Sequence, residues 1–392
     1  MTTNAETMIR LFGASWPWLL LLAALLLAGL AAVLWPEPLR FPPPQADQTR
    51  PAQEFPSSST TDLLGSTAVE AFSTWGLPLG EDGELVPYEV PLDNGPIFWN
   101  GSGEAHIQQI RVGSEKRVLK IMLEPNDDDG LLAQAYQTVE TLRVQSPEIA
   151  SYLCPARFLP RAVSVMDRDG RQRWTDVILM PYQREMLSKF IRGSLQTDHP
   201  EIRLRKLAKN FRRMVATFHR VGVLFGDYHA GNIVVGEDCR PLLIDLDNLS
   251  RVEDPDAAIA TRGHDGFQPP GRLHEPEVFE SCAERVDFFS EWVVYTSLMA
   301  YAYMDDAFDL PDKDHLLFTL DDLQPGRVSH PQKPLHILRT SGHPLLEKMA
   351  EHIAVACTPD LAPWRLFPLE ELFTEKQFTE WEADAAPVRR RI

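Results

Sequence analysis

The chain is poor in cysteine and in basic residues, and both shortages limit what it can do. Its four cysteines stand far apart, with no C-x-x-C pair and no histidine cluster beside them. This spacing excludes a zinc-ribbon type of site and a disulfide framework. Lysine and arginine number 38 against 56 aspartates and glutamates, so the formal net charge is −18. Such an acidic chain offers no basic face for phosphates, and we expect no nucleic acid among its partners.

Long uncharged stretches are also scarce, which makes the one near the N-terminus informative. Residues 16–35 (WPWLLLLAALLLAGLAAVLW) hold no charge and have tryptophan at both ends. Twenty helical residues span about 30 Å, the thickness of the bilayer hydrocarbon, and tryptophan suits its interfaces. We predict a single transmembrane helix that anchors the protein. A cleaved signal peptide is the alternative, but the preceding residues hold one basic residue, Arg10, and no clear cleavage site is present.

Proline sets this anchor apart from the rest of the chain. Residues 36–60 hold seven prolines and a serine/threonine run, a composition that forms a semi-extended linker and cannot bury a core. Residues 1–15 are expected to form an N-terminal tail. Beyond the linker we expect one two-lobed domain, with an extension and a small lobe in 61–182 and a large lobe in 183–392. Residues 62–100 show no pattern to which we assign a function.

The most informative stretch is Phe218–Asn248, where polar residues adjoin short apolar runs. Asn232 follows Asp227 by five positions, and Asp245 follows it by 18. Phosphoryl transfer needs one carboxylate to orient the attacking hydroxyl and oxygen ligands for the Mg²⁺ that bridges nucleotide phosphates. We expect Asp227 to be catalytic and Asn232 and Asp245 to bind metal. Apolar strands at 233–235 and 241–244 would hold this site on a hairpin.

These residues carry a resemblance to a known family. Asp227 and Asn232 resemble the functional positions of the protein-kinase catalytic loop H-R-D-L-x-x-x-N, and Asp245 resembles the first position of D-F-G. The chain is therefore identified as a member of the protein-kinase-like superfamily. Residues 226–232 read G-D-Y-H-A-G-N, which is similar to the G-D-x-H-x-G-N of small-molecule and glycan kinases with this fold. The D-F-G position reads D-L-D at 245–247, with a second carboxylate in place of glycine.

Lys120 is the candidate phosphate-binding residue of the small lobe. It lies in the second of two alternating apolar runs, 105–112 and 117–123, which predict a strand hairpin. A lysine on an apolar strand face needs a partner, because a buried ammonium is costly alone. The resemblance implies that Lys120 pairs with nucleotide phosphates and with a helix glutamate. Glu140, on the helical stretch 131–144, is the expected partner.

The resemblance also implies how ATP is held. Gly101 and Gly103 resemble the opening of the kinase Gly-rich loop, where glycine lets backbone amides approach phosphates, although the third glycine of that pattern is absent. Met180 and Tyr182 lie where a kinase passes from the small to the large lobe. The proline between them has no amide, so backbone groups that hold adenine are expected from these two residues.

Three further features of the large lobe match the family in part. Residues 263–271 (GHDGFQPPG) resemble the end of a protein-kinase activation segment, with Gly271 in place of the usual glutamate. Asp287 begins a largely apolar helix and resembles the aspartate that caps the catalytic-loop backbone. His219 ends an amphipathic helix, and we expect it to pack and not to catalyse.

The resemblance implies an α+β, two-lobed protein-kinase-like fold after a single N-terminal transmembrane helix. It implies ATP- and Mg²⁺-dependent transfer of the γ-phosphate to a hydroxyl, with protein serine or threonine as the first acceptor. A glycan or lipopolysaccharide-type sugar hydroxyl is the alternative acceptor. The alternative class is a pseudokinase that acts as a binding scaffold. Because the reaction needs ATP, we expect a single-pass membrane protein whose kinase domain lies in the cytoplasm.

Overall fold

The computed structural model describes residues 86–87, 105–112, 115–122, 130–166, 172–183, 185–256, 258, 263–274, 282–304, 307–311, 315–327, 330–358 and 365–383. The predicted anchor, the linker, Gly101 and Gly103 lie outside these ranges. Within them, no helix is both long and apolar enough to cross a membrane. The described part is mixed α+β with antiparallel sheets, which agrees with the predicted fold class at that level.

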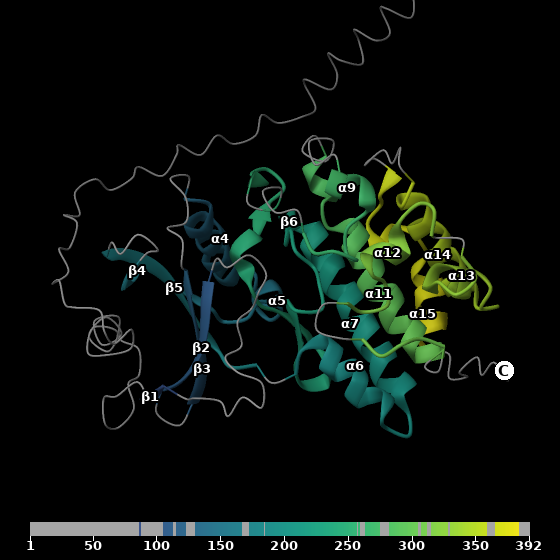
Figure 1. Cartoon of the computed structure of the whole chain (residues 1–392), viewed down its shortest axis with the longest axis horizontal. Coiled ribbons are helices and arrows are strands. Elements are labelled where there is room, and N and C mark those ends of the chain that lie inside the picture. The colour runs from purple at the N-terminus through teal and green to yellow at the C-terminus, as the bar shows by residue number, and fades with distance from the viewer. Residues whose placement is uncertain are drawn as a thin grey trace, which may run out of the picture. The chain divides into compact units, whose positions relative to one another are not determined.

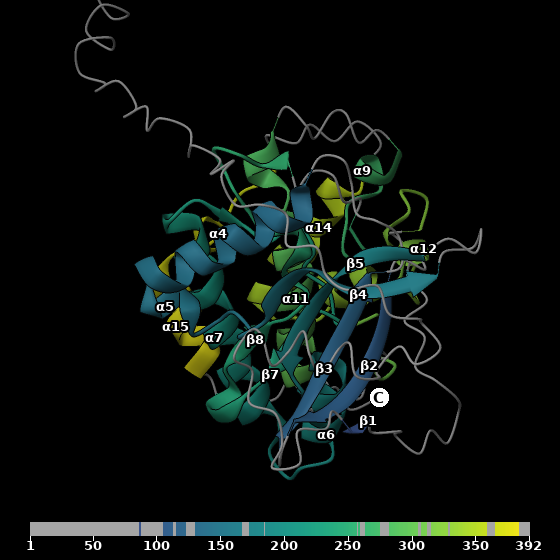
Figure 2. The ribbon, with the colours of Figure 1, turned by 90° about the vertical axis from the view of Figure 1, so that its left-hand side faces the viewer.

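A five-stranded antiparallel sheet is formed by the first half of the described chain (Figures 1 and 2). Its order is β1 (Val86–Pro87), β2 (Ala105–Val112), β3 (Glu115–Met122), β5 (Gln172–Pro181) and β4 (Arg157–Met166). Strand β3 is therefore an inner strand with a neighbour on each side. The predicted hairpin of β2 and β3 is confirmed.

Helix α4 (Leu131–Gln145) packs one face against this part of the fold. Its buried residues recur every three or four positions, as an amphipathic helix requires: Leu132, Ala135, Tyr136, Val139 and Leu142. The ring of Tyr136 stacks on Phe158 of β4, with ring centroids 5.5 Å apart. A short helix, α5 (Pro147–Ala150), follows, and the side chain of Ser146 caps it by accepting the N–H of Ile149.

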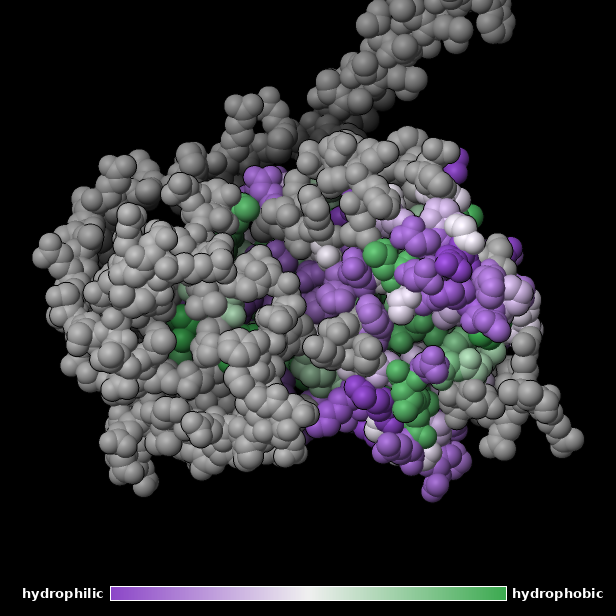
Figure 3. Space-filling view, in the orientation of Figure 1, coloured by the Kyte–Doolittle hydropathy of each residue, from purple (hydrophilic) through white to green (hydrophobic). Residues whose placement is uncertain are grey.

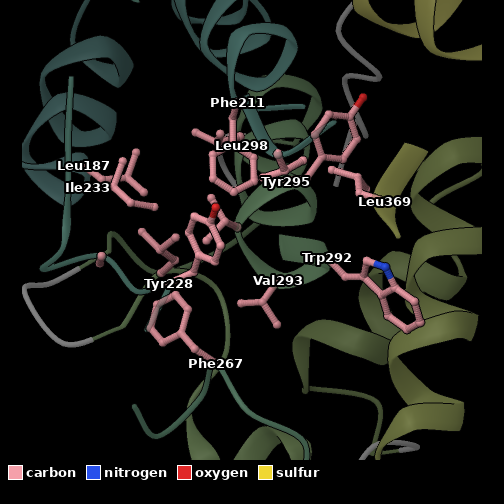
Figure 4. Packing of buried hydrophobic residues seen from close by; sticks show 14 of the residues in the cluster. Leu187, Phe211, Tyr228, Ile233, Phe267, Trp292, Val293, Tyr295, Leu298 and Leu369 are labelled. Carbon is pink, nitrogen blue, oxygen red and sulfur yellow. The ribbon is translucent and has the colours of Figure 1, made fainter. Parts of the chain in front are cut away.

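The second half of the described chain is mainly helical. Helix α11 (Phe288–Tyr303) is buried along all sixteen residues and packs against α7 (Pro200–Arg220) and α14 (Pro344–Ala356). Figure 4 shows part of this core, with Phe211 of α7 and Trp292 and Leu298 of α11 among the labelled residues. The surface of this half in Figure 3 is largely hydrophilic, with separate hydrophobic patches. The other helices are α6 (Leu187–Leu195), α9 (Pro270–His274), α12 (Leu320–Leu323), α13 (Pro334–Arg339) and α15 (Glu375–Ala383), with 3-10 turns η1 (Glu237–Cys239), η2 (Leu246–Asn248), η3 (Ala283–Arg285) and η5 (Leu369–Glu371).

Two small ribbons hold the polar loops that follow α7. Strand β7 (Ile233–Val235) pairs with β8 (Pro241–Leu243), so the predicted hairpin is confirmed. Strand β6 (Val223–Leu224) pairs with β9 (Ser250–Arg251). The buried apolar residues of these strands leave the loop 225–232 and the turn 244–249 at neighbouring ends of the two ribbons.

Candidate functional site

Asp227 and Asn232 meet within one loop. The Asn232 side chain donates from Nδ2 to Oδ2 of Asp227 at 2.9 Å and to the Asp227 carbonyl oxygen at 3.1 Å. Between them, Tyr228 is buried and packs edge-on against Phe211 of α7 (Figure 4). Because Asn232 uses its amide nitrogen on Asp227, its Oδ1 is the atom that can act as a cation ligand.

His229 gives the same carboxylate a second neighbour. Its Nδ1 accepts the N–H of Gly231 at 3.0 Å, so the neutral ring carries its proton on Nε2. That nitrogen lies 3.5 Å from Oδ2 of Asp227. The ring also stacks on His264, with centroids 4.6 Å apart. The candidate residues chosen from the sequence omit His229, although it stands inside the G-D-Y-H-A-G-N motif.

The predicted contact of Asp287 with the backbone of the loop that leads to Asp227 is confirmed. Its two carboxylate oxygens accept the N–H groups of Phe225 at 2.7 Å and Gly226 at 2.9 Å. Burial and the nearby Glu291 carboxylate raise the pKa of Asp287 to about 7. This buried carboxylate fixes the two residues that precede Asp227.

Lys120 of β3 reaches across to the turn after β8. Its Nζ lies 2.6 Å from Oδ1 of Asp245 and 2.6 Å from Oδ2 of Asp247. Burial alone lowers the pKa of Lys120, but the two carboxylates outweigh it and hold the pKa above its ordinary value. The structure thus brings Lys120 and Asp245 together, a contact that the sequence analysis did not predict.

The expected Lys120–Glu140 pair is wrong. The Glu140 side chain is 63% exposed and pairs with Arg143 on its own helix. The buried face of α4 runs through Tyr136 and Val139, so Glu140 lies beyond its edge. Tyr136 takes the inward position instead, and its hydroxyl donates to Oδ1 of Asp247 at 3.0 Å.

The backbone groups expected to hold adenine are used inside the sheet. The Tyr182 N–H donates to the Lys116 carbonyl oxygen at 3.1 Å. Met180, two residues before Tyr182, lies opposite Val118 of β3. Amides two residues apart on a strand point to the same neighbouring strand, so the Met180 amide also faces β3. Gly101 and Gly103 are not among the described residues.

Two side chains on the loops that hold Asp227 and Asp245 suit Mg²⁺. The Asp245 carboxylate and Oδ1 of Asn232 are hard oxygen ligands, the kind that this ion prefers. The Ile244 N–H donates to the Asn232 carbonyl oxygen at 2.9 Å, which ties the two loops together. The described ranges contain no group of three or more His, Cys, Asp or Glu side chains placed to hold a metal. Magnesium that is held largely by nucleotide phosphates needs only one or two protein carboxylates.

Arg272 is a further buried charge that sequence reasoning missed. It directly follows Gly271, where the resemblance described above would place a glutamate. Its Nη1 donates to Oε1 of Gln268 at 2.8 Å and to the Val286 carbonyl oxygen at 3.1 Å. Burial lowers its pKa to about 10, against the opposing effect of Asp287 and Asp227. These bonds fasten the segment 263–274 to the start of α11 without a glutamate.

A separate pocket of about 190 Å³ lies between α4 and β9. Amide and hydroxyl side chains form most of its wall, and none of the candidate residues named above lines it. Its lining residues are Gln134, Gln137, Thr138, Thr141, Leu249, Ser250, Arg251 and Asp254.

No protein-family model and no curated protein matches the chain.

Proposed function

We propose that the chain is an ATP-dependent phosphotransferase with a two-lobed protein-kinase-like fold. The observation that carries this proposal is the meeting of two sequence-distant groups. Lys120, from an inner strand of the sheet, and Asp245, from the turn after β8, are 125 residues apart in sequence and 2.6 Å apart in space. Asp227 and Asn232 lie on the loop before β7, and the turn with Asp245 follows β8, the strand that pairs with β7.

Each residue has a distinct part in the reaction. Asp227 orients the acceptor hydroxyl and takes its proton as the oxygen attacks the γ-phosphorus and ADP leaves. Lys120 binds phosphate oxygens through its ammonium group. Asn232, through Oδ1, and Asp245 would hold Mg²⁺, which would neutralise phosphate charge when bound. His229 and Asn232 hold the Asp227 carboxylate in its orientation.

A protein hydroxyl is the proposed acceptor. The segment 263–274 is fastened by Arg272, and its His264 stacks on His229 beside Asp227. This arrangement supports a segment that receives a polypeptide next to the catalytic carboxylate. The G-D-Y-H-A-G-N loop instead favours a glycan hydroxyl, which is the second candidate.

A pseudokinase is the candidate from another class. The observation that favours it is the double carboxylate around Lys120, because an ammonium held by Asp245 and Asp247 has less capacity for phosphate. For either class we propose that residues 16–35 anchor the chain in a membrane, with the folded part in the cytoplasm.

Transfer of labelled phosphate from [γ-³²P]ATP by the full-length protein in detergent tests the proposal. The acceptors are casein, the chain itself and glycolipid vesicles. Asp227→Asn should lower turnover by about 10² to 10⁴ and leave ATP affinity intact. Asp245→Ala should lower both turnover and ATP affinity, since the loss of a metal ligand affects the ground state and the transition state alike. Asp238→Asn, an exposed carboxylate paired with Lys206, is the control.

Two results would overturn the enzyme reading. If the wild type binds Mg²⁺–ATP in a thermal shift assay but transfers phosphate to none of the three acceptors, the pseudokinase is the better description. If millimolar Mg²⁺–ATP leaves the melting temperature unchanged, nucleotide binding itself is excluded.

A further inference from the structure

Lys120 has two acidic partners of different accessibility. The Asp245 side chain is 39% exposed, and the Asp247 side chain is 16% exposed. Asp245 is the proposed metal ligand and stands nearer to solvent. If it turns to a cation, Asp247 is the carboxylate that remains on the ammonium group.

Asp247 is held on both of its oxygens. Oδ2 accepts from Lys120 at 2.6 Å, and Oδ1 accepts from the Tyr136 hydroxyl at 3.0 Å. The Tyr136 ring is itself buried and stacked on Phe158 of β4. A chain of contacts therefore runs from the sheet through α4 and Asp247 to the lysine.

We propose that Asp247, aligned by Tyr136, is the positioning residue of Lys120 toward the nucleotide phosphates. This inference rests on the proposed function and assigns to the turn after β8 the part that Glu140 of α4 was expected to play. An ammonium group has three donors. Two carboxylates fix its direction and leave a donor for a phosphate oxygen.

The rival role for Asp247 is that of a second metal ligand. The hydrogen bonds argue against it, because a hydroxyl and an ammonium donor already meet its two oxygens. A cation at either oxygen would have to share that oxygen with one of these donors, and at Oδ2 it would lie beside the positively charged Lys120 ammonium group. The two roles predict different dependence on Mg²⁺, and this difference provides the test.

The experiment measures ATP affinity of the full-length protein in detergent by calorimetry, once with Mg²⁺ and once with EDTA. Asp247→Asn keeps the side-chain shape and an acceptor for Tyr136. We expect it to weaken ATP binding about tenfold in both conditions, the size of a lost charge-assisted hydrogen bond. Tyr136→Phe keeps the stacking on Phe158 and should weaken binding in the same direction, by about threefold.

Glu140→Gln and Thr141→Ala are the comparison variants on the same helix, and both should bind ATP as the wild type does. The melting temperature of each variant without nucleotide shows whether it is folded. A loss for Asp247→Asn that occurs only with Mg²⁺ would make this residue a metal ligand and overturn the inference. Tighter binding in EDTA would overturn it too, since Asp247 would then withhold Lys120 from ATP.

The outcomes also separate this inference from the proposed function. A wild type that binds ATP, with Glu140→Gln weakened and Asp247→Asn unchanged, restores Glu140 as the partner and leaves the proposed function standing. A wild type that binds no ATP in either condition overturns both.

Discussion

Nε2 of His219 lies 2.8 Å from Oε1 of Glu291, a carboxylate that is buried in the centre of the helical half. Nδ1 of the same ring lies 2.8 Å from Oε1 of Glu370. Burial alone would lower the pKa of His219, but the two carboxylates outweigh it and raise the pKa to about 11. The ring is therefore a charged link between α7, α11 and η5, which is the packing role that the sequence led us to expect.

His219→Gln should destabilise the fold by about 3 kcal/mol, because it leaves the buried Glu291 carboxylate and the half-buried Glu370 carboxylate without their cation. Denaturant unfolding measures the change. His199→Gln removes an exposed histidine that also faces a glutamate, and it should cost less than about 1 kcal/mol. Adding Glu291→Gln to the His219→Gln variant should recover part of the loss. If His219→Gln and His199→Gln are equally stable, the contact between His219 and Glu291 has no structural role.

The same link predicts a pH dependence of known sign. The folded-state pKa of His219 is raised above the value of about 6.5 expected in the unfolded chain. Its contribution is fully present below pH 6.5 and is lost as the pH rises toward 11. The difference in unfolding free energy between wild type and His219→Gln should therefore be larger at pH 6 than at pH 9. A difference that grows with pH would show that the ring is neutral.

The sequence predicted the elements of the site better than the contacts between them. The apolar runs of β7 and β8 were sufficient to predict the hairpin between the two polar loops. Local periodicity and short loops determine where Asp227, Asn232 and Asp245 lie along the chain. The partner of Lys120 was missed for a backbone reason. Asp245 adopts a left-handed conformation (φ 57°, ψ 66°), which is uncommon for aspartate and not evident from D-L-D. It leads into the 3-10 turn η2, which contains Asp247.

Helix α4 illustrates a signal that was present but not used. Its apolar residues predict a buried face, and Tyr136 belongs to that face as firmly as its neighbours Leu132 and Val139. A buried tyrosine hydroxyl requires a hydrogen-bond partner. Pattern reasoning could therefore have placed Tyr136 inward and Glu140 outward. It could not have identified Asp247 as the partner, because that contact depends on how α4 packs against a turn 111 residues away.

Gly226 should tolerate no side chain. Its φ is +83°, and an added Cβ would lie 2.9 Å from Cα of Ala258 and 3.1 Å from Cβ of Asn248. Gly226→Ala should therefore cost more than about 2 kcal/mol, from the left-handed backbone and from the clash with main chain. Thermal unfolding measures the loss. Gly193→Ala in α6 meets nothing within 4 Å and should stabilise by up to about 1 kcal/mol. If Gly226→Ala and Gly193→Ala have the same melting temperature, the close packing around Gly226 is contradicted.

Asp287 should matter for turnover more than for nucleotide binding. Asp287→Ala leaves the buried N–H groups of Phe225 and Gly226 without their acceptors, at a cost of about 1 to 3 kcal/mol for each. Asp287→Asn should cost nearly as much, because its amide nitrogen would point at one of these two donors. Both changes should displace Asp227, the residue that follows Gly226. A displacement of about 1 Å can lower turnover about 10²-fold.

ATP affinity should stay near the wild-type value in both Asp287 variants, since Lys120 and Asp245 lie on other segments. Paired measurements of turnover and ATP dissociation constant on protein that is still folded make the comparison, with Asp309→Asn as the control for an acidic change in a loop. A variant that loses ATP affinity and turnover together would mean that Asp287 supports the whole site. Unchanged turnover in Asp287→Ala would mean that the catalytic loop holds its shape without the two hydrogen bonds, and the role given to this carboxylate would have to be withdrawn.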